Sequence, residues 1–277
     1  MKTKGFVIIL VFAVLLVIAI GLRADPETLM RTSDGKKMTL KEALPDLIKV
    51  RVIFVGELHD RKSHHDAQLD MIRLLKESDA RVAIGLEMFQ AVSQLQLDKW
   101  VEGTLSESDF LAVYHENWNL DWSLYADIFR YAREQSIPMV GLNVRPEIVR
   151  QVAQNGFASL KPGQKAELPP VTCVVDKNYR EFIKRALGAH EHGNMNFTNF
   201  CEAQLLWDSA MAVHVLEYLK AHPDYTMVVI AGSGHAWKQG IPRQIHMRSD
   251  VSLRVILPQV AGRSETANDA DYLWLHH

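Results

Sequence analysis

The sequence predicts an α/β fold with a mainly parallel sheet, helices on both of its faces and a small all-helical insertion. Near-continuous apolar runs, which are typical of parallel strands covered on both faces, alternate with segments of helical periodicity. This alternation breaks once, in a long stretch of mainly helical patterns with little strand signal. With 277 residues and a hydrophobic fraction of 48%, the chain can bury a sizeable core. A net charge of -2, with no basic stripe interleaved with aromatic residues, argues against a nucleic-acid partner.

The first segment, 5–22, reads GFVIILVFAVLLVIAIGL and contains no charged residue. It follows Lys2 and Lys4, as in an export signal, and it is near the lower length limit of a membrane-spanning helix. We expect residues 1–24 to be either a cleaved signal peptide or a retained anchor to the membrane. The chain from Asp25 onward is then expected outside the cytoplasm, in a periplasmic or similar compartment.

Residues 28–277 are predicted to form the α/β domain, element by element. After a short polar lead-in, the apolar runs predicted as strands are 51–57, 81–87, 137–143, 226–232 and 253–258. Helical periodicity fills most of the gaps, at 62–77, 90–100, 106–115 and 122–136.

The helical insertion is predicted at about 146–222, above the sheet. Its helical stretches are 146–155, 178–188 and 197–221, separated by loops that contain Pro and Gly. One alternative strand, VTCVV at 171–175, remains open there. The two cysteines of the chain, Cys173 and Cys201, either pair in an oxidising compartment or stay free thiols.

Polar side chains follow four of the predicted strands. Because ligands bind in the crevice outside the carboxyl ends of parallel strands, we expect these side chains to line one site. Glycines at or beside the same positions allow sharp turns or a close approach to a ligand. In chain order, the polar residues are Glu57, His59, Glu87, Asn143, Arg145, Ser233 and His235.

Two helices place polar residues within their apolar faces. In 197–221, Gln204 and Asp208 share the face of Cys201, Met211, Val215 and Leu219. A buried carboxylate needs a hydrogen-bonding or charged partner, and the imidazoles that follow the strands are natural partners for Asp208. In 62–77, either His64 or His65 should point toward His59.

Seven motifs along the chain carry a family resemblance. They are GELHD (56–60), HHDAQLDMI (64–72), GLEMF (85–89), GLN (141–143), AQLLWDSAMA (203–212), GSGHAWKQGIP (232–242) and the terminal DYLWLHH (271–277). In their order and spacing, these motifs together resemble the ChaN-type haem-binding uptake proteins of the Tiki, TraB and erythromycin-esterase superfamily. The likeness runs over most of residues 51–274.

The resemblance implies export, haem binding in iron uptake, a tyrosine on the iron and a homodimer that encloses haem. No motif identifies the tyrosine; Tyr179 is the first candidate, followed by Tyr114 and Tyr125. Haem ligation by tyrosine or histidine is known protein chemistry. Further candidates to contact haem are His65, Arg145, Gln204 and Asp208, with Met195, Phe197 and Phe200 against the porphyrin and His190 and His192 in the nearby loop.

The alternative function is a hydrolase, an esterase or a peptidase, as in enzymatic members of the superfamily. Glu57, His59, Glu87 and His235 would then be catalytic. They would either hold a divalent metal ion that activates water or position the water directly, with His59 or His235 as the general base. The chain has no HExxH motif and no G-x-S-x-G serine motif.

Overall fold

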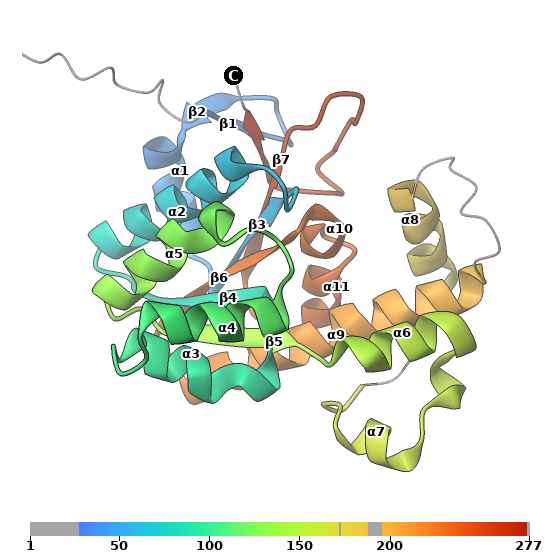
Figure 1. Ribbon diagram of the computed structural model, residues 1–277. Coiled ribbons are helices and arrows are strands. Elements are labelled where there is room, and N and C mark those ends of the chain that lie inside the picture. Colours follow the sequence, from blue (N-terminus) through green and yellow to red (C-terminus); the bar gives the residue numbers. More distant parts are fainter. Residues whose placement is uncertain (1–27, 172, 188–195, 276–277) are drawn as a thin grey trace, which may run out of the picture.

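The structure is a computed structural model that describes residues 28–171, 173–187 and 196–275 (Figure 1). The apolar segment 5–22 lies outside these residues, as do His190, His192 and Met195. Within the described ranges, no helix is both long enough and apolar enough to cross a membrane. The strands are β1 (Thr28–Arg31), β2 (Lys37–Thr39), β3 (Val52–Glu57), β4 (Arg81–Gln90), β5 (Met139–Asn143), β6 (Tyr225–Gly232), β7 (Leu253–Pro258) and β8 (Tyr272–Leu275).

All eight strands form one sheet, in the order β2-β1-β8-β7-β3-β6-β4-β5. The pairs from β8 to β5 are parallel, whereas β1 pairs antiparallel with both β2 and β8. The predicted mainly parallel sheet is therefore confirmed. Because β3, β6 and β4 are adjacent and parallel, their carboxyl ends meet at the middle of one sheet edge. There Glu57 stands in register with Gly232.

Helices cover both faces of the sheet, as predicted (Figure 1). The buried residues of α1 to α5 join one hydrophobic cluster with the sheet, and those of α8, α9 and α11 join a second cluster. The helices are α1 (Leu40–Leu47), α2 (Lys62–Glu77), α3 (Gln94–Val101), α4 (Glu107–Asn117), α5 (Trp122–Glu134), α6 (Pro146–Asn155), α7 (Pro162–Ala166), α8 (Lys177–Leu187), α9 (Phe197–Ala221), α10 (Ser233–Ala236) and α11 (Ile241–His246).

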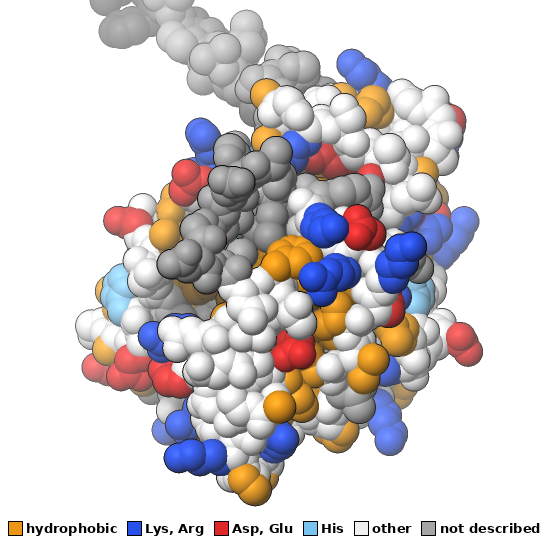
Figure 2. Space-filling model, turned by 90° about the vertical axis from the view of Figure 1, so that its right-hand side faces the viewer, with side chains coloured by type: hydrophobic (Ala, Val, Ile, Leu, Met, Phe, Trp, Pro, Cys, Tyr) orange, Lys and Arg blue, Asp and Glu red, His pale blue; other side chains and the backbone are white. Residues whose placement is uncertain are grey.

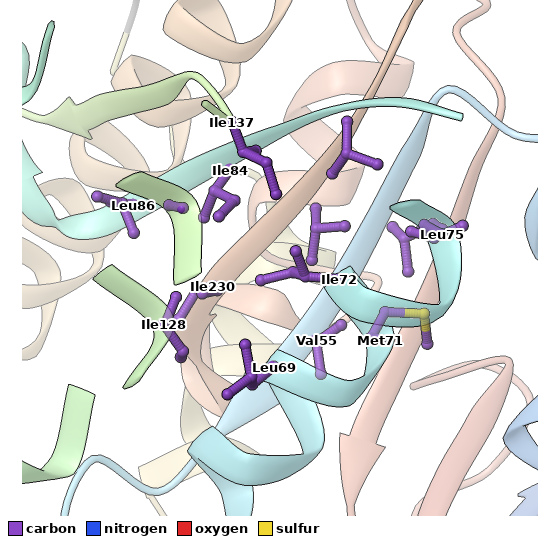
Figure 3. Close-up of a cluster of buried hydrophobic side chains, with 14 of the residues drawn as sticks. Val55, Leu69, Met71, Ile72, Leu75, Ile84, Leu86, Ile128, Ile137 and Ile230 are labelled. Carbon is purple, nitrogen blue, oxygen red and sulfur yellow. The ribbon is translucent and has the colours of Figure 1, made fainter. Parts of the chain in front are cut away.

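Helix α2 shows how periodicity produces the packing on the first face. Leu69, Ile72 and Leu75 repeat every three residues and point at the sheet, where Val55 of β3 and Ile84 of β4 meet them (Figure 3). Burying side chains of this size removes a large apolar area from water, which is the main force that holds helix and sheet together. The same packing fixes the rotation of α2 and thereby the direction of its polar residues.

The segment between β5 and β6 contains helices α6 to α9, and its described residues form no strand. The alternative of a strand at 171–175 is not realised by Val171 and residues 173–175, which lie outside the sheet, with Val174 79% exposed. Cys173 and Cys201 are free thiols, and Cys173 Sγ donates to the carbonyl oxygen of Glu202 at 3.1 Å. Figure 2 shows the face of the molecule on which the segment between β5 and β6 lies, and on this face hydrophobic side chains are interspersed with basic ones.

Candidate functional site

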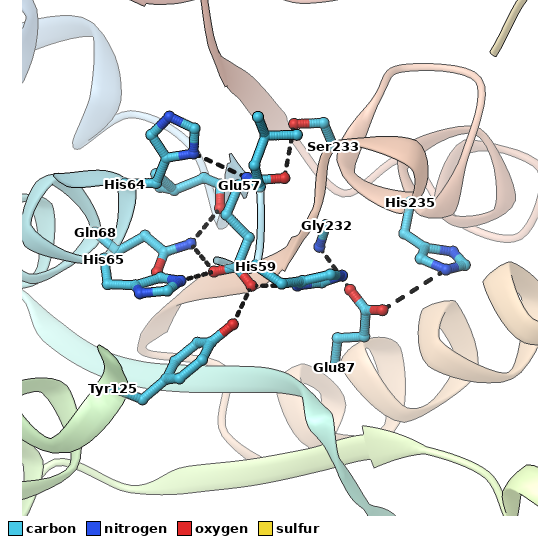
Figure 4. A network of polar contacts seen from close by, with 12 residues as sticks. Glu57, His59, His64, His65, Gln68, Glu87, Tyr125, Gly232, Ser233 and His235 are labelled. Atoms are coloured by element: carbon cyan, nitrogen blue, oxygen red, sulfur yellow. Dashed lines mark hydrogen bonds and ion pairs between the residues drawn. The ribbon is translucent and has the colours of Figure 1, made fainter. Parts of the chain in front are cut away.

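Glu57, at the end of β3, is the centre of a buried hydrogen-bond network (Figure 4). It is 1% exposed. Its Oε1 accepts from Tyr125 Oη and from His59 Nδ1, both at 2.6 Å, and its Oε2 accepts from Gln68 Nε2 at 2.7 Å. His65 Nε2 lies 3.3 Å from Oε2. These contacts compensate the carboxylate for its loss of water.

Gly232, at the end of β6, packs so closely against the His59 ring that no side chain fits at this position. A Cβ atom added to Gly232 would lie 2.8 Å from His59 Nε2 and from His59 Cε1. The N–H of Gly232 donates to Glu87 Oε2 at 2.6 Å. A residue without a side chain therefore lets His59, which follows β3, and Glu87, which lies in β4, approach the same stretch of backbone.

A second imidazole–carboxylate pair lies on the other side of Glu87. His235 of α10 bonds through Nδ1 to Asp208 Oδ1 at 2.7 Å, and its Nε2 is 3.7 Å from Glu87 Oε1. Asp208 is 1% exposed, and its Oδ2 accepts from Tyr179 Oη at 2.6 Å. Glu87 thus stands between His59 and His235 (Figure 4).

Burial and charge shift the pKa values of these groups in defined directions. Burial alone raises the pKa of Glu57, but the hydrogen bonds and charges of His59 and His65 outweigh it, so this pKa is lowered. Burial lowers the pKa of His59, yet Glu57 and Glu87 raise it overall. Burial also lowers the pKa of His235, but the charges of Glu87 and Asp208 and the hydrogen bond to Asp208 outweigh it and raise this pKa to about 9. His235 is therefore cationic at neutral pH.

Two further predicted residues hold the backbone at the strand ends. Ser233 Oγ donates to the carbonyl oxygen of Glu57 at 3.0 Å. Asn143 Nδ2 donates to the carbonyl oxygen of Glu87 at 2.7 Å, and Asn143 Oδ1 accepts from Trp207 Nε1 at 2.5 Å. These bonds tie β3 to α10 and β4 to β5 and α9, so they keep the carboxylates in place.

Other predicted residues lie at different distances from this network. His65, rather than His64, faces Glu57, while His64 Nδ1 accepts from the backbone N–H of Leu58 at 2.8 Å. Arg145 is exposed and forms a surface ion pair with Glu167 at 3.2 Å. Tyr114 is fully buried in the hydrophobic cluster of the first face.

Two clefts meet at this edge of the sheet, and Trp118 and Asn119 line both. The polar cleft has a volume of about 710 Å³. The apolar cleft has a volume of about 500 Å³ and lies between the end of α4, the ends of β4 and β5, and helices α6 and α9. The polar cleft is lined by Glu57, His59, Arg61, Gly232, His235, Trp237 and Arg263, among others, and the apolar cleft by Met88, His115, Val149, Phe200, Gln204 and Trp207, among others.

Sequence reasoning missed the aromatic residues that shape these clefts. Trp118 meets His59 edge-on with ring centroids 5.0 Å apart, and Trp207 meets His235 at 4.7 Å. Trp118 follows the helix predicted at 106–115, and Trp207 lies within the AQLLWDSAMA motif. For Trp207, its place beside Asp208 in that motif was the available signal, because large aromatic side chains commonly line ligand pockets. Trp118 carries no comparable signal in the sequence.

The predicted metal set is together in space, but it is not arranged as a metal site. Within the described part of the chain, no group of three or more His, Cys, Asp or Glu side chains is placed to hold a metal ion. The oxygens of Glu57 are engaged by neighbouring side chains, and His59 and His235 each direct Nδ1 at a carboxylate. In place of the predicted ligand cluster, the structure has two imidazole–carboxylate pairs, with Glu87 between them.

Comparison with known proteins agrees with this fold. Residues 43–245 match the family model described as haem-binding uptake, Tiki superfamily, ChaN. ChaN of Campylobacter jejuni, described by its cofacial haem binding, is 19% identical, with a TM-score of 0.72 over 90% of this chain and 96% of that chain. No curated protein matches the chain.

Two more distant structures share the fold. An erythromycin esterase variant in its open conformation is 16% identical, with a TM-score of 0.51 over 90% of this chain and 82% of that chain. A succinoglycan biosynthesis protein is 12% identical, with a TM-score of 0.51 over 79% and 68%. Because the family model covers residues 43–245 of the 277, the chain belongs to the ChaN family of haem-binding uptake proteins in the Tiki superfamily.

Proposed function

We propose that the protein binds haem for uptake outside the cytoplasm and holds the macrocycle in the apolar cleft. Family membership supports haem as the ligand. The observation that carries the location is the cleft itself, about 500 Å³, with Phe200, Trp207, Val149 and Met88 in its walls. Its volume lies within the range of about 300–1,000 Å³ that is typical of ligand pockets, and its aromatic and aliphatic walls suit a flat apolar macrocycle.

Polar groups of the cleft also suit haem. Gln204 lines the cleft, and its Oε1 is buried without a hydrogen-bond partner among the described residues. A buried acceptor of this kind is costly unless a ligand or water satisfies it. Arg150 lines the cleft as well, and its exposed ion pair with Glu147, at 3.0 Å, can exchange for a propionate. Phe200 and Gln204, two of the residues that the sequence suggests as haem contacts, both line this cleft, which supports the proposal.

Export and assembly are part of the proposal. Export is supported by the uncharged segment 5–22 after Lys2 and Lys4, which acts as a signal or as an anchor. A homodimer that encloses haem is supported by the family resemblance. Light scattering with and without haemin measures the assembly, and a stoichiometry of one haemin per protomer in a haemin-dependent dimer is expected.

Haemin titration of the purified full-length protein tests haem binding. A saturable Soret change is expected at micromolar haemin. Phe200→Asp places a charge in the apolar cleft and should weaken binding at least about tenfold. Val92→Asp is the matched control, because Val92 is 69% exposed and lines neither cleft. If the wild type shows no saturable change, the proposed function is wrong.

A second candidate function is ester hydrolysis in the polar cleft, and the two imidazole–carboxylate pairs around Glu87 favour it. His59, bonded through Nδ1 to Glu57, lines the cleft and is suited to take a proton from water as the water adds to an ester carbonyl. Cationic His235 is suited to give a proton to the leaving alcohol oxygen as the C–O bond breaks. The products are a carboxylic acid and an alcohol.

Turnover of an aryl ester tests this candidate. His59→Ala should lower kcat/KM by about 100-fold or more, since general acid–base groups contribute about 10²–10⁴. His222→Ala should change nothing, because His222 is exposed and lines neither cleft. Turnover is expected to survive chelation, because the two imidazole–carboxylate pairs supply the proton transfers. Equal rates for His59→Ala and the wild type would eliminate the candidate.

A further inference from the structure

The polar cleft differs in charge between its buried base and its exposed mouth. At the base, Glu57, Glu87 and Asp208 meet two imidazoles, so the carboxylates outnumber the histidines even when both rings are cationic. At the mouth, two exposed arginines, Arg61 and Arg263, line the cleft. An anionic group of a ligand is therefore repelled by the base and attracted to the mouth.

Arg263 is the arginine of the mouth whose charge is not matched. Arg61 Nε lies 3.7 Å from Asp60 Oδ1, whereas the Arg263 side chain forms no ion pair or hydrogen bond within the described part of the chain. Its guanidinium lies over the ring of Trp237, 5.9 Å from the ring centroid. Contact with an aromatic face orients the guanidinium and leaves its N–H groups free to donate. Such a group is suited to a ligand carboxylate, which it binds through two parallel hydrogen bonds.

The rest of the cleft suits a small organic molecule that reaches from base to mouth. Trp118 and Leu120 line the same cleft and provide apolar surface for a carbon skeleton. Its volume of about 710 Å³ lies within the range of about 300–1,000 Å³ that is typical of ligand pockets. A ligand with its carboxylate at Arg263 therefore has room for an uncharged group beside His59 at the base.

We propose that the polar cleft binds compounds that carry a carboxylate, and that Arg263 is the residue that selects them. The inference rests on the ester-hydrolysis candidate and names its substrate class: esters that carry a carboxylate remote from the reacting carbonyl. The carboxylate pairs with Arg263 at the mouth, and the ester carbonyl lies beside His59 at the base. Arg263 is then a specificity residue that does not touch the reacting atoms.

Isothermal titration calorimetry of the full-length protein with phenylbutyrate and with phenylbutanamide tests the proposal. The two compounds have nearly the same shape and differ in charge, and neither contains an ester bond, so binding is measured without turnover. The wild type should bind phenylbutyrate at least about tenfold more tightly, because only the carboxylate pairs with Arg263. In Arg263→Gln this preference should fall to within about threefold, while the affinity for phenylbutanamide stays within about threefold of the wild type.

Three comparisons separate the role of Arg263 from a general effect of positive charge. Arg81→Gln should keep the full preference, because Arg81 is exposed, begins β4 at the opposite edge of the sheet and lines neither cleft. Arg263→Lys should keep only part of it, because an ammonium group cannot form the two parallel hydrogen bonds. Raising the salt concentration from about 0.05 M to about 0.5 M should reduce the preference of the wild type, since exposed charges are screened.

Equal affinities of the wild type for the two compounds, or binding of neither, would overturn the proposal. Loss of both compounds in Arg263→Gln would overturn it as well, because the residue would then act on the fold of the cleft. If inorganic phosphate displaces phenylbutyrate at comparable concentrations, the mouth is a phosphate site and the assignment to carboxylates is wrong. Failure of the hydrolase candidate looks different: His59→Ala and the wild type would turn over the aryl ester at equal rates, while the calorimetric preference would remain.

Discussion

At the scale of single residues, the polar edge of the sheet depends on close packing between backbone and side chains. Glu57 accepts hydrogen bonds from three side chains, and Gly232 leaves the space that the His59 ring occupies. Each hydrogen bond to a charged group contributes about 1.5–3 kcal/mol to stability. Small changes here should therefore have measurable effects.

Gly232→Ala should displace the His59 ring and break its hydrogen bond to Glu57. The backbone φ of Gly232 is -53°, which any residue adopts, so the effect comes from the added Cβ. We expect a loss of about 1–3 kcal/mol in the free energy of unfolding, measured with urea. Gly234→Ala is the control, because an added Cβ there meets nothing within 4 Å. Equal effects of the two changes would contradict the close approach.

The raised pKa of His235 predicts a pH dependence of stability. In the unfolded chain a histidine titrates near about 6.5, and in the folded protein the pKa of His235 is about 9. Its stabilising contribution is therefore complete below about pH 6.5 and is lost as the pH rises through about 9; it amounts to about 3 kcal/mol. Nuclear magnetic resonance of the ring measures this pKa directly. Titration near 6.5 in the folded protein would refute the ion pair with Asp208.

At the scale of elements, two long helices were predicted most accurately. The predicted bounds 62–77 and 197–221 match α2 and α9. Strands β1, β2 and β8 were missed, because they are short and their pairing is long-range: Leu29 of β1 stands opposite Trp274 of β8. Such pairing depends on the folded sheet and leaves little local pattern.

In the site, too, some features could be predicted from the sequence and others could not. Glu57, His59, Glu87 and His235 could be placed together from sequence, because parallel strands end at one edge. The contact of Tyr125 with Glu57 could not, since it depends on how α5 is rotated against α2. Prediction of helix faces cannot resolve such rotations to a single side chain.

Helix α2 should be a main source of stability, because it carries Gln68 and His65 to Glu57 on a buried face. Ile72→Ala should cost about 2–5 kcal/mol in the free energy of unfolding, through lost burial and the cavity that remains. Leu95→Ala in α3, where the side chain is 59% exposed, should stay within about 0.5 kcal/mol. Chemical denaturation of both variants checks the difference. A similar cost at both positions would contradict the packing of α2.

At the scale of the whole molecule, one sheet edge supports two neighbouring clefts of different chemistry. The parallel strands bring carboxylates and imidazoles to the polar cleft, and helices α6 and α9 add the wall of the apolar cleft. Trp118 and Asn119 lie between them. In the proposed function, haem binding in the apolar cleft is therefore separate from the acid–base groups of the polar cleft, so each can be disrupted alone.

Haemin titration of two variants tests this separation most directly. The haemin affinity of Phe200→Asp should fall at least about tenfold, because the change disrupts the apolar cleft. The affinity and Soret spectrum of His59→Ala should stay at wild-type values, because His59 lines only the polar cleft. Loss of haemin binding in His59→Ala with full binding in Phe200→Asp would contradict the account and place haem in the polar cleft.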